Sequence, residues 1–359
     1  MQAPKYALDT AHRQVCNVYS TRTKLQVRPV TGGMFGAVVL CVAAAAIFAS
    51  WLPLQVSIVT VFLFAGPHNW FELRYFLMRL PARFGRSRNF FVTAFVGLAV
   101  LTISYVSLPF AYNAVNASSE TWLSVLAIWN TLMLAWIAAL IHLRAKQKQP
   151  RTGASQRTAD SSQRTANWSW SIPTILALAA FNWFVPDFFS LALVYIHPLI
   201  ALWFLDRHLK KTRPAWVGPY RRCLCLLPLI LAVMIWRLSQ TIPLGDDNGL
   251  FWRITQHSGA ELLPQLSSHM LVSVHLFLEM LHYGVWILAL PLLSARFFKA
   301  GAVKRGLPRL KPALLTVGIV AVVILWVGFT ADYTKTRDLY FTIAIAHVLA
   351  EAPFLLRML

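Results

Sequence analysis

Residues 304–330 read KRGLPRLKPALLTVGIVAVVILWVGFT, a basic segment followed directly by a long apolar run. The run from Pro312 to Thr330 contains no Asp, Glu, Lys or Arg. It is close to the roughly 20 residues that a helix needs to cross the hydrocarbon core of a bilayer. Because basic segments and long apolar runs alternate along most of the chain, the sequence predicts an all-α, polytopic membrane helix bundle.

The composition supports this class and argues against nucleic-acid binding. The chain is 57% hydrophobic and only 13% charged, whereas about 25% charged residues is usual for soluble domains. The net charge of +20 could indicate a nucleic-acid partner. However, the Lys and Arg residues recur between apolar runs, as they do in cytoplasmic loops of membrane proteins. We therefore expect membrane lipids as partners and no nucleic acid.

Ten apolar ranges predict about ten transmembrane helices, and the basic residues predict their orientation. With the N-terminus inside, 29 of the 33 Lys and Arg residues fall on the cytoplasmic side. Losing or adding one span would destroy this alternation of basic loops, so ten spans with both termini in the cytoplasm are predicted. The expected location is the cytoplasmic membrane of a bacterium. The predicted spans are 33–51, 54–72, 90–111, 121–143, 170–186, 188–206, 222–238, 268–294, 312–330 and 339–357.

The chain divides into four predicted segments. Residues 1–32 form a basic cytoplasmic N-terminal segment, and residues 33–143 form the first four helices. Residues 144–169 are rich in Ser, Thr, Gln and Arg and contain SQRTA twice, which predicts a flexible cytoplasmic linker. Residues 170–359 form the last six helices. Within the longest predicted outside loop, residues 251–266 are expected to form a short amphipathic surface helix.

Ionisable residues inside the predicted spans are the main functional signal. Such residues cost about 2.5–3.5 kcal/mol at the bilayer centre, so they indicate function by default. Three His residues are followed four positions later by Glu, which places each pair on one helix face. These pairs are His68 with Glu72, His275 with Glu279, and His347 with Glu351; His197 and His282 also lie within spans.

These residues predict an intramembrane metal site. Neutral imidazole is a common ligand of Fe, Cu and Zn, and a carboxylate can bind the metal or orient a His ring. We expect at least three of the rings within about 8 Å of a common point, with iron as the metal and copper, zinc or haem as alternatives. The predicted metal ligands are His68, His197, His275, His282 and His347, and the predicted catalytic residues are Glu279 and Glu351.

The remaining His residues and Tyr283 are not expected to take part in the metal site. His142, His257 and His269 lie at span ends or in loops and are expected at the membrane interface, whereas His208 is expected to be solvated in a basic loop. Tyr283 is interpreted as a packing residue. The competing hypothesis for the whole set is that the intramembrane His side chains make separate hydrogen bonds between helices.

The segment Gly66-Pro67-His68-Asn69-Trp70-Phe71-Glu72 resembles a family signature. It is similar to the Pro-His-x-x-x-Asp motif near the start of the Brp/Blh membrane β-carotene 15,15′-dioxygenases, with Glu72 in place of Asp. That family also has a His near its C-terminus, where His347 lies here. The resemblance covers about a tenth of the chain. It implies iron held by four intramembrane His residues and oxidative cleavage of a carotenoid within the bilayer.

Three function classes remain open from the sequence. The first is a metal-dependent oxidase or oxygenase acting on a lipophilic substrate, which requires the His residues to converge. The second is a transporter or channel with a His/Glu pathway for protons or metal ions. Transporters often contain inverted repeats, and no clear repeat relates the two halves of this chain. The third is a structural subunit of a membrane assembly.

The predicted orientation can be tested with topology reporters. Fusions after residues 88, 160 and 300 should report a cytoplasmic location, and fusions after residues 115, 248 and 334 an external one, because the basic loops stay inside. Alkaline phosphatase and green fluorescent protein activities provide complementary readouts. A reversed signal at any one site contradicts the ten-span arrangement.

Overall fold

The computed structural model describes residues 32–81, 84–114, 118–148, 168–245, 249–299 and 310–358. Within these ranges the regular structure is entirely helical, as predicted. The elements are α2 (Gly32–Trp51), α3 (Pro53–Arg79), η1 (Gly85–Ser87), α4 (Arg88–Ala114), α5 (Ser119–Lys148), α6 (Ser171–Phe184), α7 (Pro186–Thr212), η3 (Pro214–Trp216), α8 (Val217–Leu238), α9 (Gly249–His257), α10 (Ser268–Tyr283), η4 (Gly284–Ala289), α11 (Leu290–Lys299), α12 (Leu310–Ala331) and α13 (Tyr333–Met358).

Six of the described helical segments are long and apolar enough to cross a membrane. They are Arg88–Ala114, Ser119–Gln147, Pro186–Thr212, Ser268–Ser294, Pro312–Ala331 and Tyr333–Met358. Each of the ten predicted ranges overlaps a helix, and 268–294 is shared by α10, η4 and α11. The all-helical membrane class is therefore supported by length and composition.

The segment boundaries differ from the predicted ones in two places. Residues 144–148, assigned to the flexible linker, continue α5 to Lys148, and residues 149–167 lie outside the described residues, as do residues 1–31. The helix observed in the region of the expected surface helix, residues 251–266, is α9 (Gly249–His257), which is shorter than expected. It ends at His257, and Gly259 follows with φ of +88°, a left-handed conformation that favours glycine.

Helix starts in this bundle use local signals that the sequence supplies. Pro53 and Pro186 each occupy the first turn of a helix, α3 and α7, where the missing N–H costs nothing. Val185 is extended, with φ of −147°, so α6 and α7 meet at a sharp corner. α6 packs along α5, where the side-chain amide of Asn130 donates to Asn182 at 2.8 Å, and the corner turns the chain from α6 into α7.

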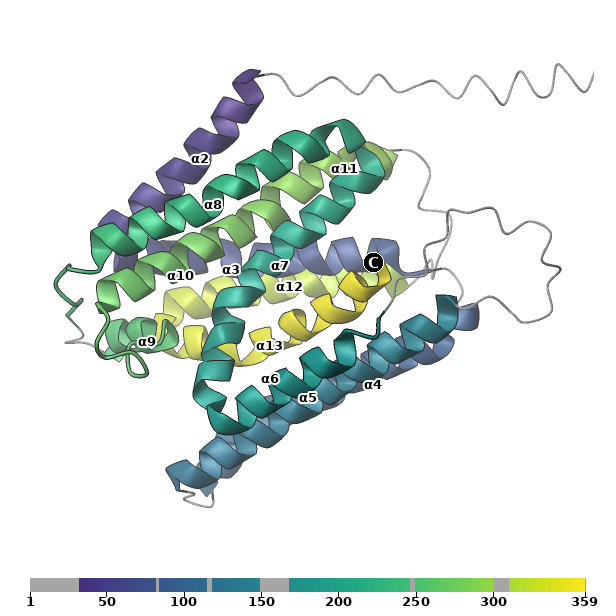
Figure 1. The fold of residues 1–359 in the computed structure, drawn as a ribbon, viewed down its shortest axis with the longest axis horizontal. Helices are drawn as coiled ribbons and strands as arrows, with labels where there is room; N and C mark the ends of the chain where they lie inside the picture. Colours follow the sequence, from purple (N-terminus) through teal and green to yellow (C-terminus); the bar gives the residue numbers. More distant parts are fainter. Residues whose placement is uncertain are drawn as a thin grey trace, which may run out of the picture.

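The helices form layers around a central group (Figure 1). α4, α5 and α6 lie together along one side, α2, α8 and α10 lie along the opposite side, and α3, α7, α12 and α13 lie between them (Figure 1). Aromatic side chains pack the centre at one end. Phe76 of α3 stacks on Phe354 of α13 with ring centroids 4.2 Å apart, and Trp286 beside them is fully buried.

Basic residues from four helices meet at the end of the bundle where α13 finishes. Arg144 of α5 donates to the carbonyl of Arg357, which in turn donates to the carbonyl of Arg79 of α3. Lys211 of α7 donates to the carbonyl of Met358. These residues all belong to predicted cytoplasmic segments. Arg253 and Asp338, both predicted to be external, form an ion pair with each other.

The packing of α4 on α5 requires glycine at position 97. A Cβ there would lie 2.0 Å from Nε1 of Trp136, whose indole N–H donates to the carbonyl of Thr93. Gly97→Ala should therefore displace Trp136, break this hydrogen bond and lower the free energy of unfolding by about 1–3 kcal/mol. Thermal unfolding in detergent measures the change. Gly218→Ala in α8 is the matched control, since nothing lies within 4 Å of its Cβ; an equal loss there would contradict this packing.

Candidate metal centre

Four helices bring four of the five predicted His ligands together. His68 of α3, His197 of α7 and His347 of α13 lie near the middle of their helices, and His282 lies at the end of α10, near the middle of the continuous segment Ser268–Ser294. The ring centroids are 4.6 Å apart for His197 and His282, 5.0 Å for His197 and His347, and 5.2 Å for His68 and His347. The distance from His68 to His282 is 5.3 Å. The expected convergence of at least three rings is therefore observed for these four.

Irregular helix geometry accompanies three of these residues. Pro67 precedes His68 inside α3, and Pro198 follows His197 inside α7. Each proline removes one helical N–H donor, which loosens the helix locally. One residue after His282, the chain changes from α10 to the π-helical turn η4. π-Helical turns inside helices occur frequently at functional sites.

Two buried carboxylates complete the cluster. Glu351 accepts a hydrogen bond from Nδ1 of His197 at 3.1 Å, and Glu72 lies one helical turn after His68. The side chains of Glu72 and Glu351 are each 1% exposed. Among the described residues, neither Glu forms an ion pair with Lys or Arg. A charge on Glu72 therefore needs a proton or a cation from another source, whereas Glu351 has the ring of His197 as a partner.

The orientation of the rings leaves donor atoms facing inward. Nδ1 of His68 contacts the carbonyl of Phe64 at 3.0 Å, so Nε2 presents a lone pair to the cluster when the ring is neutral. Nε2 of His197 and Nε2 of His347 face each other at 3.1 Å. At this distance one of the two nitrogens can donate a hydrogen bond to the other.

Several buried polar atoms of the cluster have no hydrogen-bond partner among the residues that the structure describes. Such atoms are rare in folded proteins and point to an ion, a water or a catalytic role. Here they are Nε2 of His68, both carboxylate oxygens of Glu72, both ring nitrogens of His282, Nδ1 of His347 and Oε1 of Glu351.

The donor atoms fall into two adjacent sets, each with its atoms within 4.8 Å of one another. His68, Glu72, His282 and His347 form the first set, and His197, His282 and Glu351 form the second. Imidazole and carboxylate donors suit Fe, Zn, Mn or Cu rather than Mg or Ca, which prefer all-oxygen sites. The residues present therefore fit a transition metal. Glu72, predicted only through its spacing from His68, is part of this centre.

The fifth predicted ligand, His275, does not join this cluster. It lies with His257 and Glu279 in a separate group of potential ligands, and the ring centroids of His257 and His275 are 5.1 Å apart. Nδ1 of His275 is 3.9 Å from a carboxylate oxygen of Glu279, so the predicted i, i+4 pair does meet. His257, expected at the interface, was missed because its short helix α9 folds back onto α10, a tertiary contact without a local sequence signal.

The structure also corrects the interpretation of His208. Its side chain is 2% exposed, not solvated, and its Nδ1 lies 2.8 Å from Nη2 of Arg79. The reason is that α7 continues past the predicted span and packs its last turns against α3. His142 is exposed on α5, and His269 contacts the backbone carbonyl of Ser50. Tyr283, interpreted as a packing residue, is buried, and its ring centroid lies 4.5 Å from that of His68. It therefore packs directly against the His cluster.

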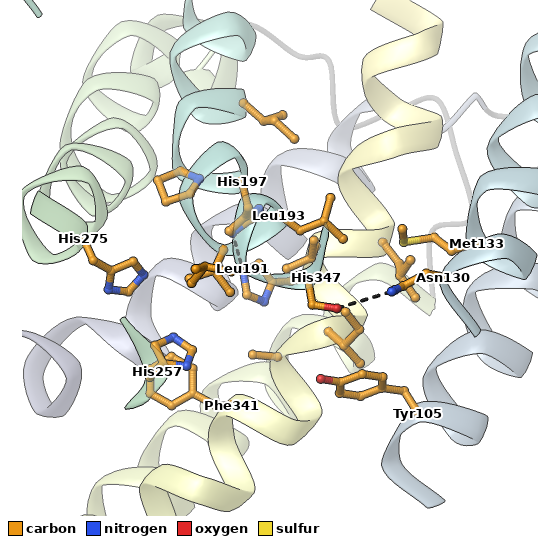
Figure 2. Close-up of a pocket in the computed structure, with 18 of the residues that line it drawn as sticks. Tyr105, Asn130, Met133, Leu191, Leu193, His197, His257, His275, Phe341 and His347 are labelled. Atoms are coloured by element: carbon orange, nitrogen blue, oxygen red, sulfur yellow. Dashed lines mark hydrogen bonds between the residues drawn. The ribbon is translucent and has the colours of Figure 1, made fainter. Parts of the chain in front are cut away.

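A large cavity adjoins both groups of polar residues. Its volume is about 800 Å³, within the range of small-molecule sites. Figure 2 shows His197 and His347 near its centre, His257 and His275 at one side, and Tyr105, Asn130 and Met133 at the opposite side. The wall formed by α4 and α5 is mostly aromatic and aliphatic, with Trp122, Leu126, Trp129 and Trp136. This wall suits an apolar molecule next to the clustered His side chains.

Comparisons with known proteins found no matching family model, no matching curated protein and no matching solved structure.

The position of His282 leads to a prediction about metal content. It belongs to both donor sets, so His282→Ala should reduce bound metal more than any other single His substitution. Glu351→Gln should weaken binding about 10–100-fold, because the amide holds the ring of His197 less well. Metal content of purified protein, measured by mass spectrometry, provides the test. His142→Ala is the control, and a comparable loss of metal in that variant would contradict the assignment.

Proposed function

We propose that the chain is an integral membrane, metal-dependent oxidase or oxygenase that acts on a lipophilic substrate, with iron as the metal. The observation that carries this proposal is the opening of an apolar cavity onto buried imidazole and carboxylate groups without partners. A structural role requires no such cavity, and hydrogen bonds between helices would leave fewer polar atoms unsatisfied.

The topology proposed for this function has ten spans with both termini in the cytoplasm. The meeting of basic residues from α3, α5, α7 and α13 at one end supports a common cytoplasmic side. The ion pair of Arg253 and Asp338 at the other end agrees with an external location. Four helices outside the six long apolar segments, α2, α3, α6 and α8, complete the proposed set. In this arrangement the His cluster lies near the bilayer midplane, where apolar molecules concentrate.

Iron bound by His and carboxylate residues supplies the ability to activate O2. The chain's own groups prepare the site for this chemistry. Glu351 accepts a hydrogen bond from Nδ1–H of His197, which leaves Nε2 of that ring unprotonated toward the cluster. The backbone carbonyl of Phe64 does the same for His68. The aromatic wall of α4 and α5 excludes water and positions an apolar substrate beside these rings.

The resemblance of residues 66–72 to the carotenoid dioxygenases suggests the first substrate to test. His68, His197, His282 and His347 supply the four intramembrane His residues that the resemblance implies. A carotenoid is therefore proposed first, with other long unsaturated lipids next.

The proposed activity can be tested directly with purified protein. Anaerobically iron-loaded protein in detergent should consume O2 when β-carotene or another long unsaturated lipid is added, and His282→Ala should not. An oxygen electrode and mass spectrometry of extracted products provide the readouts. If the iron-loaded protein consumes no O2 but proteoliposomes carry protons or metal ions, the transporter hypothesis replaces this one.

The cavity wall can be tested separately from the metal ligands. Met133 of α5 lines the cavity and is 5% exposed, whereas the neighbouring Leu132 is 56% exposed and faces outward. Met133→Trp should fill the cavity and lower kcat/KM by at least tenfold without loss of metal, since a displaced substrate costs binding energy. Leu132→Trp should retain activity. Equal activity in the two variants would show that the substrate does not occupy this cavity.

A further inference from the structure

The arrangement of the cluster bears on how many metal ions it holds. All donors of one ion lie within about 4.4 Å of one another when metal–donor bonds are about 2.0–2.2 Å. Six side chains contribute to the cluster, but they do not form a single set of mutually close donor atoms. Instead they divide into the two sets described above, which share only His282.

Each set contains the donors that one divalent ion needs. The first set offers three imidazoles and the carboxylate of Glu72, and the second offers two imidazoles and the carboxylate of Glu351. Two His residues and one carboxylate are sufficient for a non-haem iron ion. His282 can contribute to either set, because both of its ring nitrogens are buried and without partners.

A single ion would leave part of the cluster unsatisfied. An ion in the first set would leave Glu351 with the hydrogen bond from His197 and, at its other oxygen, at most a weak contact with the indole N–H of Trp286. An ion in the second set would leave both carboxylate oxygens of Glu72 in that state. The unpartnered atoms are therefore distributed over both sets, and occupation of both sets provides ligands for each carboxylate.

The two sets are also close enough to form one centre. Nε2 of His347, in the first set, is 3.1 Å from Nε2 of His197, in the second. The donors come from four helices, with a His and a Glu one turn apart on both α3 and α13 and a single His on both α7 and α10. Helical bundles that bind two metal ions also draw Glu and His ligands from four facing helices, although they use four Glu and two His where this cluster has two Glu and four His.

We propose that this cluster is a dinuclear metal centre, with one transition-metal ion held by His68, Glu72 and His347 and a second held by His197, His282 and Glu351. The proposal rests on the proposed function, because it specifies the metal content of the same site.

Metal stoichiometry tests the number of ions. Full-length protein is stripped with a chelator, reloaded anaerobically with Fe(II), desalted and analysed for iron per chain. The expected ratio is two in the wild-type protein and in the exposed control His142→Ala. The double variants H68N/E72Q and H197N/E351Q, each affecting one set, should retain about half of the iron. X-ray absorption should show a metal–metal distance of about 3–4 Å in the wild-type protein only.

The outcomes separate this inference from the proposed function. One ion per chain in the wild-type protein, without metal–metal scattering, overturns the dinuclear centre and leaves a mononuclear oxygenase intact. Absence of retained iron overturns both. Size-exclusion profiles and circular dichroism identify any double variant that fails to fold. If a double variant fails to fold, the corresponding single variant, E72Q or E351Q, is used in its place. This single variant should weaken the binding of one ion and leave the other ion bound.

Discussion

The burial of polar side chains within apolar helices is the constraint on which the rest of the structure depends. In a hydrocarbon environment, an unpaired imidazole or carboxylate has no water to bind, so its donors and acceptors must be satisfied inside the bundle or by a bound ion. Elsewhere in the described core protein groups meet much of this requirement, although single atoms such as Oγ1 of Thr102 and Nε2 of His208 are also buried without a hydrogen-bond partner. Asn130 and Asn182 bind each other, and the hydroxyl of Tyr195 donates to backbone carbonyls. The cluster around His282 is different, because its polar atoms converge without completing one another.

The scaffold around this cluster explains how the convergence is maintained. The aromatic packing of Phe76, Phe354 and Trp286 joins α3, α13 and η4 near one end of the site. Tyr195 connects α7 with α10 and with the turn after α9 near the other end, through the carbonyls of Leu271 and Ser258. The four helices that supply the ligands are thus fixed relative to one another by contacts above and below the ligands. A metal site benefits from such rigid support, because small displacements of ligands weaken binding.

The sequence predicted much of this arrangement, for physical reasons that can be stated residue by residue. Helix positions followed from apolar runs, and the pairing of His68 with Glu72 and of His347 with Glu351 followed from helical spacing. What spacing cannot provide is the rotation of each helix about its own axis. His275 and His282 lie on the same helix, yet they serve different groups, because α10 presents them to different neighbours. His257 lies with His275 and Glu279 because α9 packs against α10. His208 is buried because α7 extends beyond its apolar run.

The central claim is that a transition metal is bound among His68, His197, His282 and His347, and anomalous X-ray diffraction tests it most directly. Data collected on either side of the iron absorption edge, from crystals of the protein purified without added chelator, locate iron independently of any assumed chemistry. We expect an anomalous difference peak within about 2–2.3 Å of donor nitrogens of His68 and His347, and a second peak at a similar distance from donor atoms of His197 and Glu351. A map without a peak in this cluster at the edge of iron, copper, zinc or manganese, with the rings bonded to one another or to water, would contradict the account and favour hydrogen bonding between helices.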